Sequence, residues 1–393
     1  MSETFDPNPS TPYLTPPRDS EATRPEPGNR LSGSPPDLDV LAELSGQNIL
    51  YARQFSFRHV AELCKLAAFL EKVEIWPYHP LDGKIITTAF FEASTRTRTS
   101  FESAVHRLAG KIISIPDGSL TGAKKGESLQ DIGEMFNAYC DCVVMRHTET
   151  DAPKRMLENL RIPLINAGNG SGEHPTQALA DWYALLKWEP RLAAPFETGD
   201  RKLNLGILGT PGSMRAVKSF LLMSLNFSDH IEKVTVISEM ADPFGKDVTE
   251  SLDRANIPYE VTNDIRENLP QEYDTLVTRI RRGDIDLVAD GNTVLELGDR
   301  VRVVTQRQNM PRLSALFGDS YKALDSRYKL DAQSGLKRDA VILHPLARLD
   351  ELDTSLDKTP HNLYFSQAHG AVFVRQALLL AVLGRLDRLP EFH

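Results

Sequence analysis

The chain has 393 residues, of which 41% are hydrophobic and 25% are charged, an ordinary composition for a soluble globular protein. This length favours two domains, each large enough to bury its own core. A formal net charge of -9 argues against nucleic acid or an acidic membrane surface as the main partner. Any anion that the protein binds must therefore be held by a local cluster of basic residues.

The sequence also lacks the usual marks of a membrane or secreted protein. No stretch approaches the ~18 uninterrupted apolar residues of a membrane span, and the N-terminus has no apolar secretory core. The three cysteines, Cys64, Cys140 and Cys142, suggest a reducing compartment, so we expect a cytoplasmic protein. The pair Cys140 and Cys142 could contribute to a metal site, but no Cys or His cluster completes a four-ligand set. We therefore expect no metal and no cofactor.

The first part of the chain differs from the rest. Residues 1–38 are rich in Pro, Ser, Thr, Glu and Arg without apolar periodicity, which predicts a disordered tail. Beyond it, apolar patterns predict helices over 57–73, 97–108, 176–187, after Gly212, and over 368–383. Strands are expected over 84–91, 111–115, 142–146, 203–208 and 234–238. Because helices separate the strands, we predict the α/β class, with two mainly parallel sheets covered by helices and joined by a hinge at 189–200.

The strongest chemical signal is the string FFEASTRTRTSF at 90–101. A buried strand ends and a helix starts within 94–97. Free backbone N–H groups at a helix start, hydroxyl groups and an arginine together form a site for a phosphate dianion. The alternative interpretation is an ordinary Ser/Thr helix cap with surface arginines.

Taken whole, this string resembles the carbamoyl-phosphate signature of the aspartate and ornithine carbamoyltransferases. Residues 125–129 (KGESL) resemble the family's mobile loop, which in the active trimer reaches into a neighbouring subunit's site. Residues 144–147 (VMRH) and 166–177 (NAGNG to HPTQ) match further segments of the family. Residues 344–361, with HPL, Arg348 and DKTPH, resemble the aspartate enzyme specifically. The resemblance extends from about residue 45 to 387.

The resemblance implies a role for each matching residue. Thr97, Arg146 and His174 would point at the carbonyl oxygen of carbamoyl phosphate, where negative charge develops, and with Lys125 they are the expected catalytic residues. Gln177 and the Leu346 carbonyl would hold the carbamoyl NH₂ group. The full expected carbamoyl-phosphate site is Ser94, Thr95, Arg96, Thr97, Arg146, His174, Gln177, Leu346, Ala347, Thr121 and Lys125, the last from the adjacent chain. Neither a metal nor a covalent intermediate is needed.

The second half carries a glycine-containing turn at 209–215 (GTPGSMR) after a buried strand. A dinucleotide-binding protein would have G-x-G-x-x-G here with an acidic residue after the next strand, where Glu239 stands. The glycine spacing does not fit. In the resemblance, Arg215 and Arg279 instead bind the two carboxylates of aspartate, since a bidentate guanidinium suits each of them. Lys125 and Arg281 complete the expected aspartate site.

Three departures from the family pattern lie near the second substrate. Arg281 replaces a glutamine, Ala347 replaces a proline in a cis turn, and Thr121 stands where a serine is usual. The block from about 279 to 324 is also longer than the family's equivalent, and it resembles the β-rich C-terminal module of potassium-uptake regulators. This block is expected to be a structural insert or a ligand-binding module.

The sequence therefore predicts an aspartate carbamoyltransferase-like enzyme of pyrimidine synthesis, binding carbamoyl phosphate and aspartate in a homotrimer. A regulatory chain or pathway enzyme could associate with it. The expected domains are 39–188 for carbamoyl phosphate, with the helix at 368–387 packing back on it, and 189–367 for aspartate, with an insert at 283–320. The alternatives are a carbamoyltransferase for a different amine and a non-catalytic trimeric scaffold that binds anions.

Overall fold

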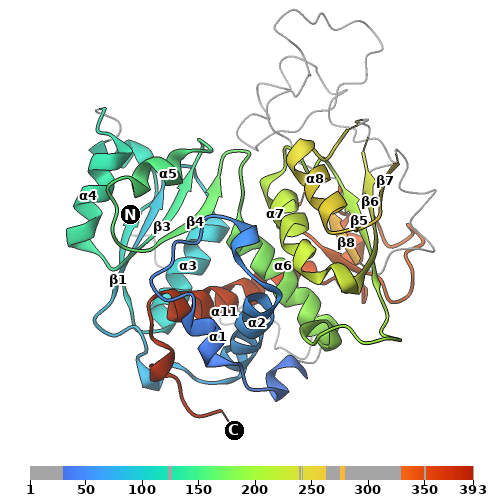
Figure 1. The fold of residues 1–393 in the computed structure, drawn as a ribbon, viewed down its shortest axis with the longest axis horizontal. Coiled ribbons are helices and arrows are strands. Elements are labelled where there is room, and N and C mark those ends of the chain that lie inside the picture. Colours follow the sequence, from blue (N-terminus) through green and yellow to red (C-terminus); the bar gives the residue numbers. More distant parts are fainter. Residues whose placement is uncertain are drawn as a thin grey trace, which may run out of the picture.

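The computed structural model describes residues 30–122, 126–238, 240, 242–262, 275–278, 329–348 and 351–392. Within these ranges, helices and strands alternate and build two separate parallel sheets, which confirms the predicted α/β class. Figure 1 shows the two sheets side by side, each with its own helices, and a group of long helices below them.

The first sheet is built from residues that precede 170. Its strands combine β-branched and apolar residues, and the strands β1, β3 and β4 are almost fully buried. The elements of this half are α1 (Leu38–Ala42), α2 (Phe57–Lys72), β1 (Ile85–Phe90), α3 (Thr95–Arg107), β2 (Lys111–Ile115), α4 (Leu129–Tyr139), β3 (Cys142–His147), α5 (Ala152–Leu157), β4 (Leu164–Asn169) and α6 (Pro175–Trp188).

The second sheet follows the linking segment at 189–202. All of its paired strands run parallel, in the order β7-β6-β5-β8-β9. The elements are β5 (Leu203–Leu208), α7 (Arg215–Ser224), β6 (Ile231–Ile237), α8 (Lys246–Arg254), β7 (Tyr259–Thr262), β8 (Thr275–Thr278), β9 (Val341–Leu343) and α11 (Tyr364–Val382).

Strand order places the motifs at the carboxyl ends of central strands. In the first sheet the order is β2-β1-β3-β4: β2 is added on one side of β1 and β3 and β4 on the other, so the strand order reverses between β1 and β3, where Phe90 pairs with Arg146. In the second sheet the reversal falls between β5 and β8. Ligands of open α/β sheets bind at such switch points. The FFEASTRT string follows β1, and the loop that leads to Arg215 follows β5, so both motifs lie at these positions.

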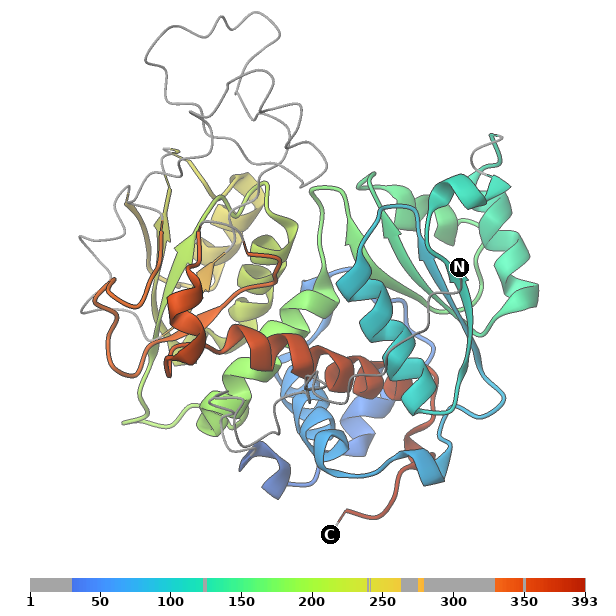
Figure 2. The ribbon, with the colours of Figure 1, turned by 180° about the vertical axis from the view of Figure 1, so that it is seen from behind.

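Two helices connect the halves. Helix α6 packs on α2 and α7, and its Trp182 ring stacks on Phe227 with centroids 3.7 Å apart. Helix α11 packs against α2, α3 and α6, and Figure 2 shows it running from the second half across to the first. Most of its residues are buried, because helices surround it on several sides. None of the described helices is long and apolar enough to cross a membrane.

The structure corrects several predicted boundaries. The ordered chain starts before residue 38: Leu31 is only 4% exposed and packs in the main core, and Asp37 caps α1. Helix α3 begins at Thr95, two residues earlier than expected, and α11 begins at Tyr364. Apolar periodicity missed the first turn of α3 because Thr95 and Arg96 are polar and exposed. The first turn of α11 begins with Tyr364 and Phe365, which pack in a separate small core cluster. Residues 1–29 lie outside the described part of the chain.

The contact between α6 and α11 yields a first prediction. A Cβ atom at Gly370 would lie 2.8 Å from Cδ1 of Tyr183, a fully buried ring whose hydroxyl donates to Glu71. Gly370→Ala should therefore lower the free energy of unfolding by about 1–2 kcal/mol, because overpacking outweighs the better helix propensity of alanine. Thermal or urea unfolding measures the change. Gly33→Ala is the matched control, since nothing lies within 4 Å of its added Cβ. Equal stability of the two variants would contradict the packing argument.

Candidate active site

A cavity of about 470 Å³ opens between the two sheets. Its walls come from the start of α3, the end of β3, the start of α6 and α7, the loop after β9, and α11. Among the predicted site residues it is lined by Ser94, Arg96, Thr97, Arg146, His174, Gln177, Arg215 and Leu346. Residues separated by up to 252 positions in sequence, from Ser94 to Leu346, thus share one cavity.

The start of α3 provides an anion-binding end to this cavity. Ser94 is the N-cap residue, and the unpaired N–H groups of the first turn carry the positive end of the helix dipole. Thr97 is buried at 7% exposure, whereas the Arg96 side chain reaches across the cavity and donates to the Leu346 carbonyl oxygen. Burial lowers the pKa of Arg96 from its ordinary value, but the group stays charged.

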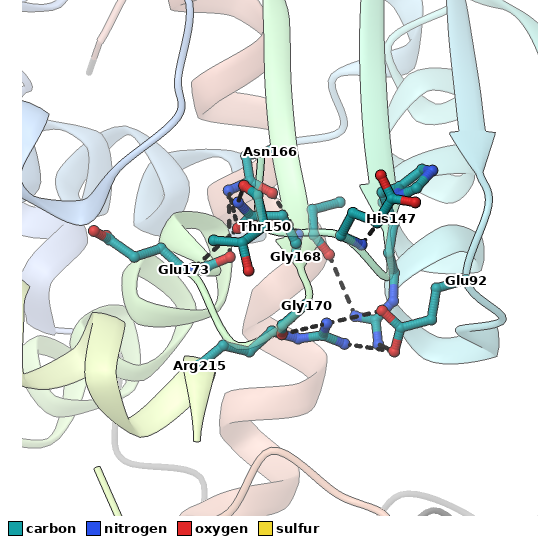
Figure 3. Close-up of polar contacts among 12 residues, drawn as sticks. Glu92, His147, Thr150, Asn166, Gly168, Gly170, Glu173 and Arg215 are labelled. Carbon is teal, nitrogen blue, oxygen red and sulfur yellow. Dashed lines mark hydrogen bonds and ion pairs between the residues drawn. The ribbon is translucent and has the colours of Figure 1, made fainter. Parts of the chain in front are cut away.

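A single carboxylate beside the cavity joins the two halves. Glu92 Oε1 accepts hydrogen bonds from Arg146 Nη2 at 2.9 Å and Arg215 Nη2 at 2.8 Å, and its Oε2 accepts from Arg215 Nη1 at 2.8 Å. Burial raises the pKa of Glu92, but the hydrogen bonds and charges of Arg215 and Arg146 outweigh it, so the pKa lies below its usual value. Figure 3 shows Glu92 and Arg215 meeting in this bridge.

The end of β4 and the turn after it shape the space in which the two guanidinium groups lie. Gly168 has φ +113°, and a Cβ there would lie 3.1 Å from both Arg146 Nη1 and Arg215 Nε. Asn166 Oδ1 accepts from Gly168 N at 2.8 Å, and Gly170 O accepts from Arg215 Nη1 at 3.0 Å. A glycine is therefore required at 168 by both backbone conformation and space. Figure 3 shows Asn166, Gly168 and Gly170 along this segment.

The start of α6 contributes an imidazole and an amide. His174 is 3% exposed, and its backbone N–H donates to Ser219 Oγ on α7 at 2.7 Å. The ring Nδ1 of His174 lies 3.4 Å from Thr176 Oγ1. If the Thr176 hydroxyl donates to Nδ1, the ring proton is on Nε2, where it can serve a developing oxyanion. Gln177, one position further, lines the cavity and donates to Asp181 Oδ1 at 2.8 Å.

The loop after β9 forms the opposite wall. The Leu346–Ala347 peptide bond is cis although residue 347 is not proline, and Leu346 has φ +52°. Arg348 turns away from the cavity: it forms an ion pair with Asp357 and lies over the Tyr364 ring at 5.6 Å. The cis turn that the sequence left open is therefore present with alanine.

Some predicted residues lie elsewhere. Thr95 begins α3 on its exposed side, Ala347 is exposed beside the cis bond, and Thr121 bonds to the Gly118 carbonyl away from the cavity. These three do not line the cavity of the described single chain. Lys125, Arg279 and Arg281 lie outside the described residues, as does most of the inserted block. Within the described residues, no group of three or more His, Cys, Asp or Glu side chains could hold a metal.

Sequence reasoning missed Glu92, Gln367 and Asp181. Glu92 stands inside the string FFEASTRT, and an acidic residue next to an expected anion site was the signal that could have drawn notice. Gln367 lines the cavity from α11, and Asp181 lies behind Gln177. No local pattern marks these two as site residues: Asp181 contacts Gln177 one helical turn away, but its contact with Gln367 joins residues 186 positions apart.

The arrangement suits an acyl phosphate. One end of the cavity offers helix N–H groups and Arg96 for a phosphate, and the centre offers Thr97, Arg146 and His174 as hydrogen-bond donors for a carbonyl oxygen. Gln177 and the Leu346 carbonyl offer acceptors for an N–H group. Arg215, on the second half, provides a guanidinium for a carboxylate.

Comparison with known families agrees with this geometry. The profile of the aspartate/ornithine carbamoyltransferase, carbamoyl-P binding domain, matches residues 47–187. The TrkA-C domain matches residues 263–318, which confirms the predicted likeness of the inserted block and starts it earlier than 279. Strand β8 falls within this second match, yet it pairs with β5 and β9 of the main sheet.

Relatives cover almost the whole chain. The aspartate carbamoyltransferase catalytic subunit of Methanopyrus kandleri is 33% identical over 345 residues, 88% of this chain and 99% of the relative. That of Thermococcus kodakarensis is 34% identical over 346 residues, 87% of this chain and 98% of the relative. Aspartate transcarbamoylase from Trypanosoma cruzi in complex with N-(phosphonacetyl)-L-aspartic acid has a TM-score of 0.71 and 29% identity, covering 89% of this chain and 98% of that chain. This chain belongs to the aspartate/ornithine carbamoyltransferase family.

The Glu92 bridge gives a second prediction. Glu92→Gln keeps the shape but leaves two buried guanidinium groups without a carboxylate, and should lower the free energy of unfolding by about 2 kcal/mol at neutral pH. Because the folded-state pKa of Glu92 is lowered, its stabilisation is present at neutral pH and is lost as the pH falls through that pKa. The difference between wild type and variant should therefore shrink in acid.

Unfolding curves across pH measure this difference. Glu134→Gln is the matched control, because Glu134 forms an exposed pair with Arg161 at 2.7 Å that should add little to stability. A loss of stability that is equal in the two variants, or that is independent of pH, would contradict the role given to the bridge.

Proposed function

We propose that this chain transfers the carbamoyl group of carbamoyl phosphate to the α-amino group of L-aspartate, giving N-carbamoyl-L-aspartate, phosphate and a proton. The observation that carries the proposal is the shared cavity, in which a helix start, three donors and two acceptors converge at the carboxyl ends of the sheets. Relatives named aspartate carbamoyltransferase over 86–88% of this chain support it.

The proposed mechanism follows from the residues that line the cavity. The amine nitrogen attacks the carbonyl carbon, a new N–C bond forms, and charge moves to the carbonyl oxygen. Thr97, Arg146 and His174 stabilise that charge as fixed donors. The C–O bond to phosphate then breaks, and the helix start with Arg96 stabilises the departing anion. The attacking nitrogen loses one proton on the way to product.

Aspartate is the acceptor that the second half favours. Arg215 is 2% exposed and lines the cavity, so a carboxylate that replaced its contact with Glu92 would be bound bidentately. Arg279 and Arg281, outside the described residues, are proposed to add positive charge on the same side. Such a site disfavours a cationic acceptor such as ornithine. A carbamoyltransferase for another acidic amine is the second candidate, because Arg281 and the inserted block depart from the family pattern.

The assembly and location are proposals as well. The likeness of residues 125–129 to the mobile loop supports a homotrimer in which Lys125 completes a neighbour's site, and the three free cysteines support a cytoplasmic location. We also propose a division into a carbamoyl-phosphate domain at 39–188 and an aspartate domain at 189–367. The inserted block would extend the second domain.

The direct test is an amine screen with carbamoyl phosphate, scored by phosphate release and by the ureido product. Aspartate should be the best acceptor, and ornithine should give no product above background. If another amine is carbamoylated faster than aspartate, that amine and not aspartate is the substrate. Release of no phosphate with any amine would favour the non-catalytic scaffold.

The phosphate end of the site gives a third prediction. Arg96→Ala removes the guanidinium at the start of α3 and should weaken carbamoyl phosphate binding by at least about tenfold, because a charge-assisted contact to phosphate is lost. Calorimetry measures the affinity. Arg107→Ala is the control: it lies on the exposed last turn of the same helix, where it bonds to Ser103 at 3.3 Å. Equal affinities for wild type and Arg96→Ala would remove Arg96 from the site.

Shared sites give a fourth prediction. If Lys125 serves a neighbour, inactive Lys125→Ala chains mixed with inactive His174→Ala chains should regain activity. Each mixed trimer contains one intact site, so random exchange of equal amounts restores roughly a quarter of all sites. Each variant taken through the same exchange alone is the control. No recovery after verified subunit exchange would mean that each site is built within one chain.

A further inference from the structure

A buried carboxylate behind the cavity has no part in the mechanism above. Asp181 lies on α6, is 3% exposed, and stands one helical turn after Gln177. Its Oδ1 accepts the Gln177 side-chain amide at 2.8 Å and also accepts the Gln367 side-chain amide from α11. One oxygen of Asp181 thus binds two glutamines that both line the cavity.

The chemistry of a carboxylate decides how the two amides point. An ionised carboxylate can only accept hydrogen bonds, so each glutamine must turn its NH₂ group toward Asp181. The Oε1 atom of Gln177 is thereby turned away from Asp181, where it can accept a hydrogen bond from a ligand. The same rule holds for Gln367, whose Oε1 accepts from His344 N at 2.8 Å.

A second acceptor, the Leu346 carbonyl, is held in place through Gln367. His344 is 2% exposed, and its Nδ1 accepts from Leu346 N at 2.9 Å. Its Nε2 therefore carries the ring proton, and lies 3.2 Å from Glu351 Oε1. The backbone of Leu346 is thus held from Asp181 by way of Gln367 and His344, and the Leu346 carbonyl accepts from Arg96 inside the cavity.

The charge of Asp181 has a compensating partner nearby. Arg375 on α11 is 3% exposed, donates to Ser100 and lies 4.8 Å over the Phe101 ring. Burial lowers the pKa of Arg375 to about 10, and the negative charge of Asp181 opposes that shift. A buried carboxylate beside a site for anions is tolerated only with such compensation.

We propose that Asp181 is a positioning residue that sets two acceptors, Gln177 Oε1 and the Leu346 carbonyl, so that the site selects an acyl phosphate bearing NH₂ on its carbonyl carbon. The proposal rests on the carbamoyl transfer proposed above. The carbamoyl NH₂ group has two N–H donors, one for each acceptor. An acetyl group presents a methyl group instead, which leaves both acceptors unpaired, and sites built this way reject such analogues strongly.

The test compares carbamoyl phosphate with acetyl phosphate as acyl donors to aspartate. Wild type should prefer carbamoyl phosphate by at least about a hundredfold in kcat/KM. Asp181→Ala frees the Gln177 amide to rotate, so the ratio between the two donors should fall at least about tenfold, mainly through the loss with carbamoyl phosphate. Asp181→Asn keeps an oxygen that can accept both amides, and should retain more of the preference than Asp181→Ala.

Two further variants separate positioning from folding. Glu62→Ala removes another buried carboxylate, which is 8% exposed and does not line the cavity. This change should alter kcat/KM by the same factor with both acyl donors. If Asp181→Ala does not fold, Gln367→Met serves instead. It keeps the Gln177–Asp181 contact and breaks only the contacts that run from Asp181 through Gln367 and His344 to Leu346. The preference for carbamoyl phosphate over acetyl phosphate should then fall, but by less than about tenfold.

The outcomes distinguish the two levels of the proposal. If kcat/KM in Asp181→Ala falls by the same factor with carbamoyl phosphate and with acetyl phosphate, the role of Asp181 is overturned while carbamoyl transfer stands. When Asp181→Ala does not fold, the same result in Gln367→Met overturns it. Wild-type chain that transfers neither acyl group to aspartate overturns the function itself.

Discussion

The site depends on one carboxylate placed between two guanidinium groups. Glu92 follows β1 of the first sheet, and it binds Arg146 from β3 and Arg215 from α7 of the second half. Two buried positive charges could not lie this close without it. The two arginines line the cavity from the two halves, and Glu92 joins them. In this structure Glu92 therefore forms ion pairs with Arg146 and Arg215, two of the arginines proposed to bind the substrates.

Helices α6 and α11 form the base on which this cavity rests. Both pack deep in the core, and both place polar side chains at the cavity: His174 and Gln177 from α6, Gln367 and Arg375 from α11. Because these side chains start from buried helices, their positions vary little. The buried carboxylate Asp181 then fixes the direction of two amides at once.

The second half keeps a parallel sheet although its sequence contains the inserted block. The parallel sheet continues through β8 and β9, although the TrkA-C match at residues 263–318 includes β8 and part of the segment between the two strands. Loops at the ends of strands accept long insertions at small entropic cost, so the sheet tolerates the block. The cis turn at Leu346 also persists without the proline that the family pattern calls for.

The sequence by itself determined the α/β class, four of the nine described strands to within one residue, and the family with its phosphate motif, because these follow from local patterns. It could not reveal Glu92 as a bridge, or Asp181 and Gln367 as partners of the site. Glu92 contacts Arg146 and Arg215, 54 and 123 positions away, and Asp181 contacts Gln367, 186 positions away; only packing brings such residues together. It also placed Thr95, Thr121 and Ala347 with the site on resemblance alone. In the single chain these side chains lie outside the cavity, since the direction of a side chain is decided by the fold around it.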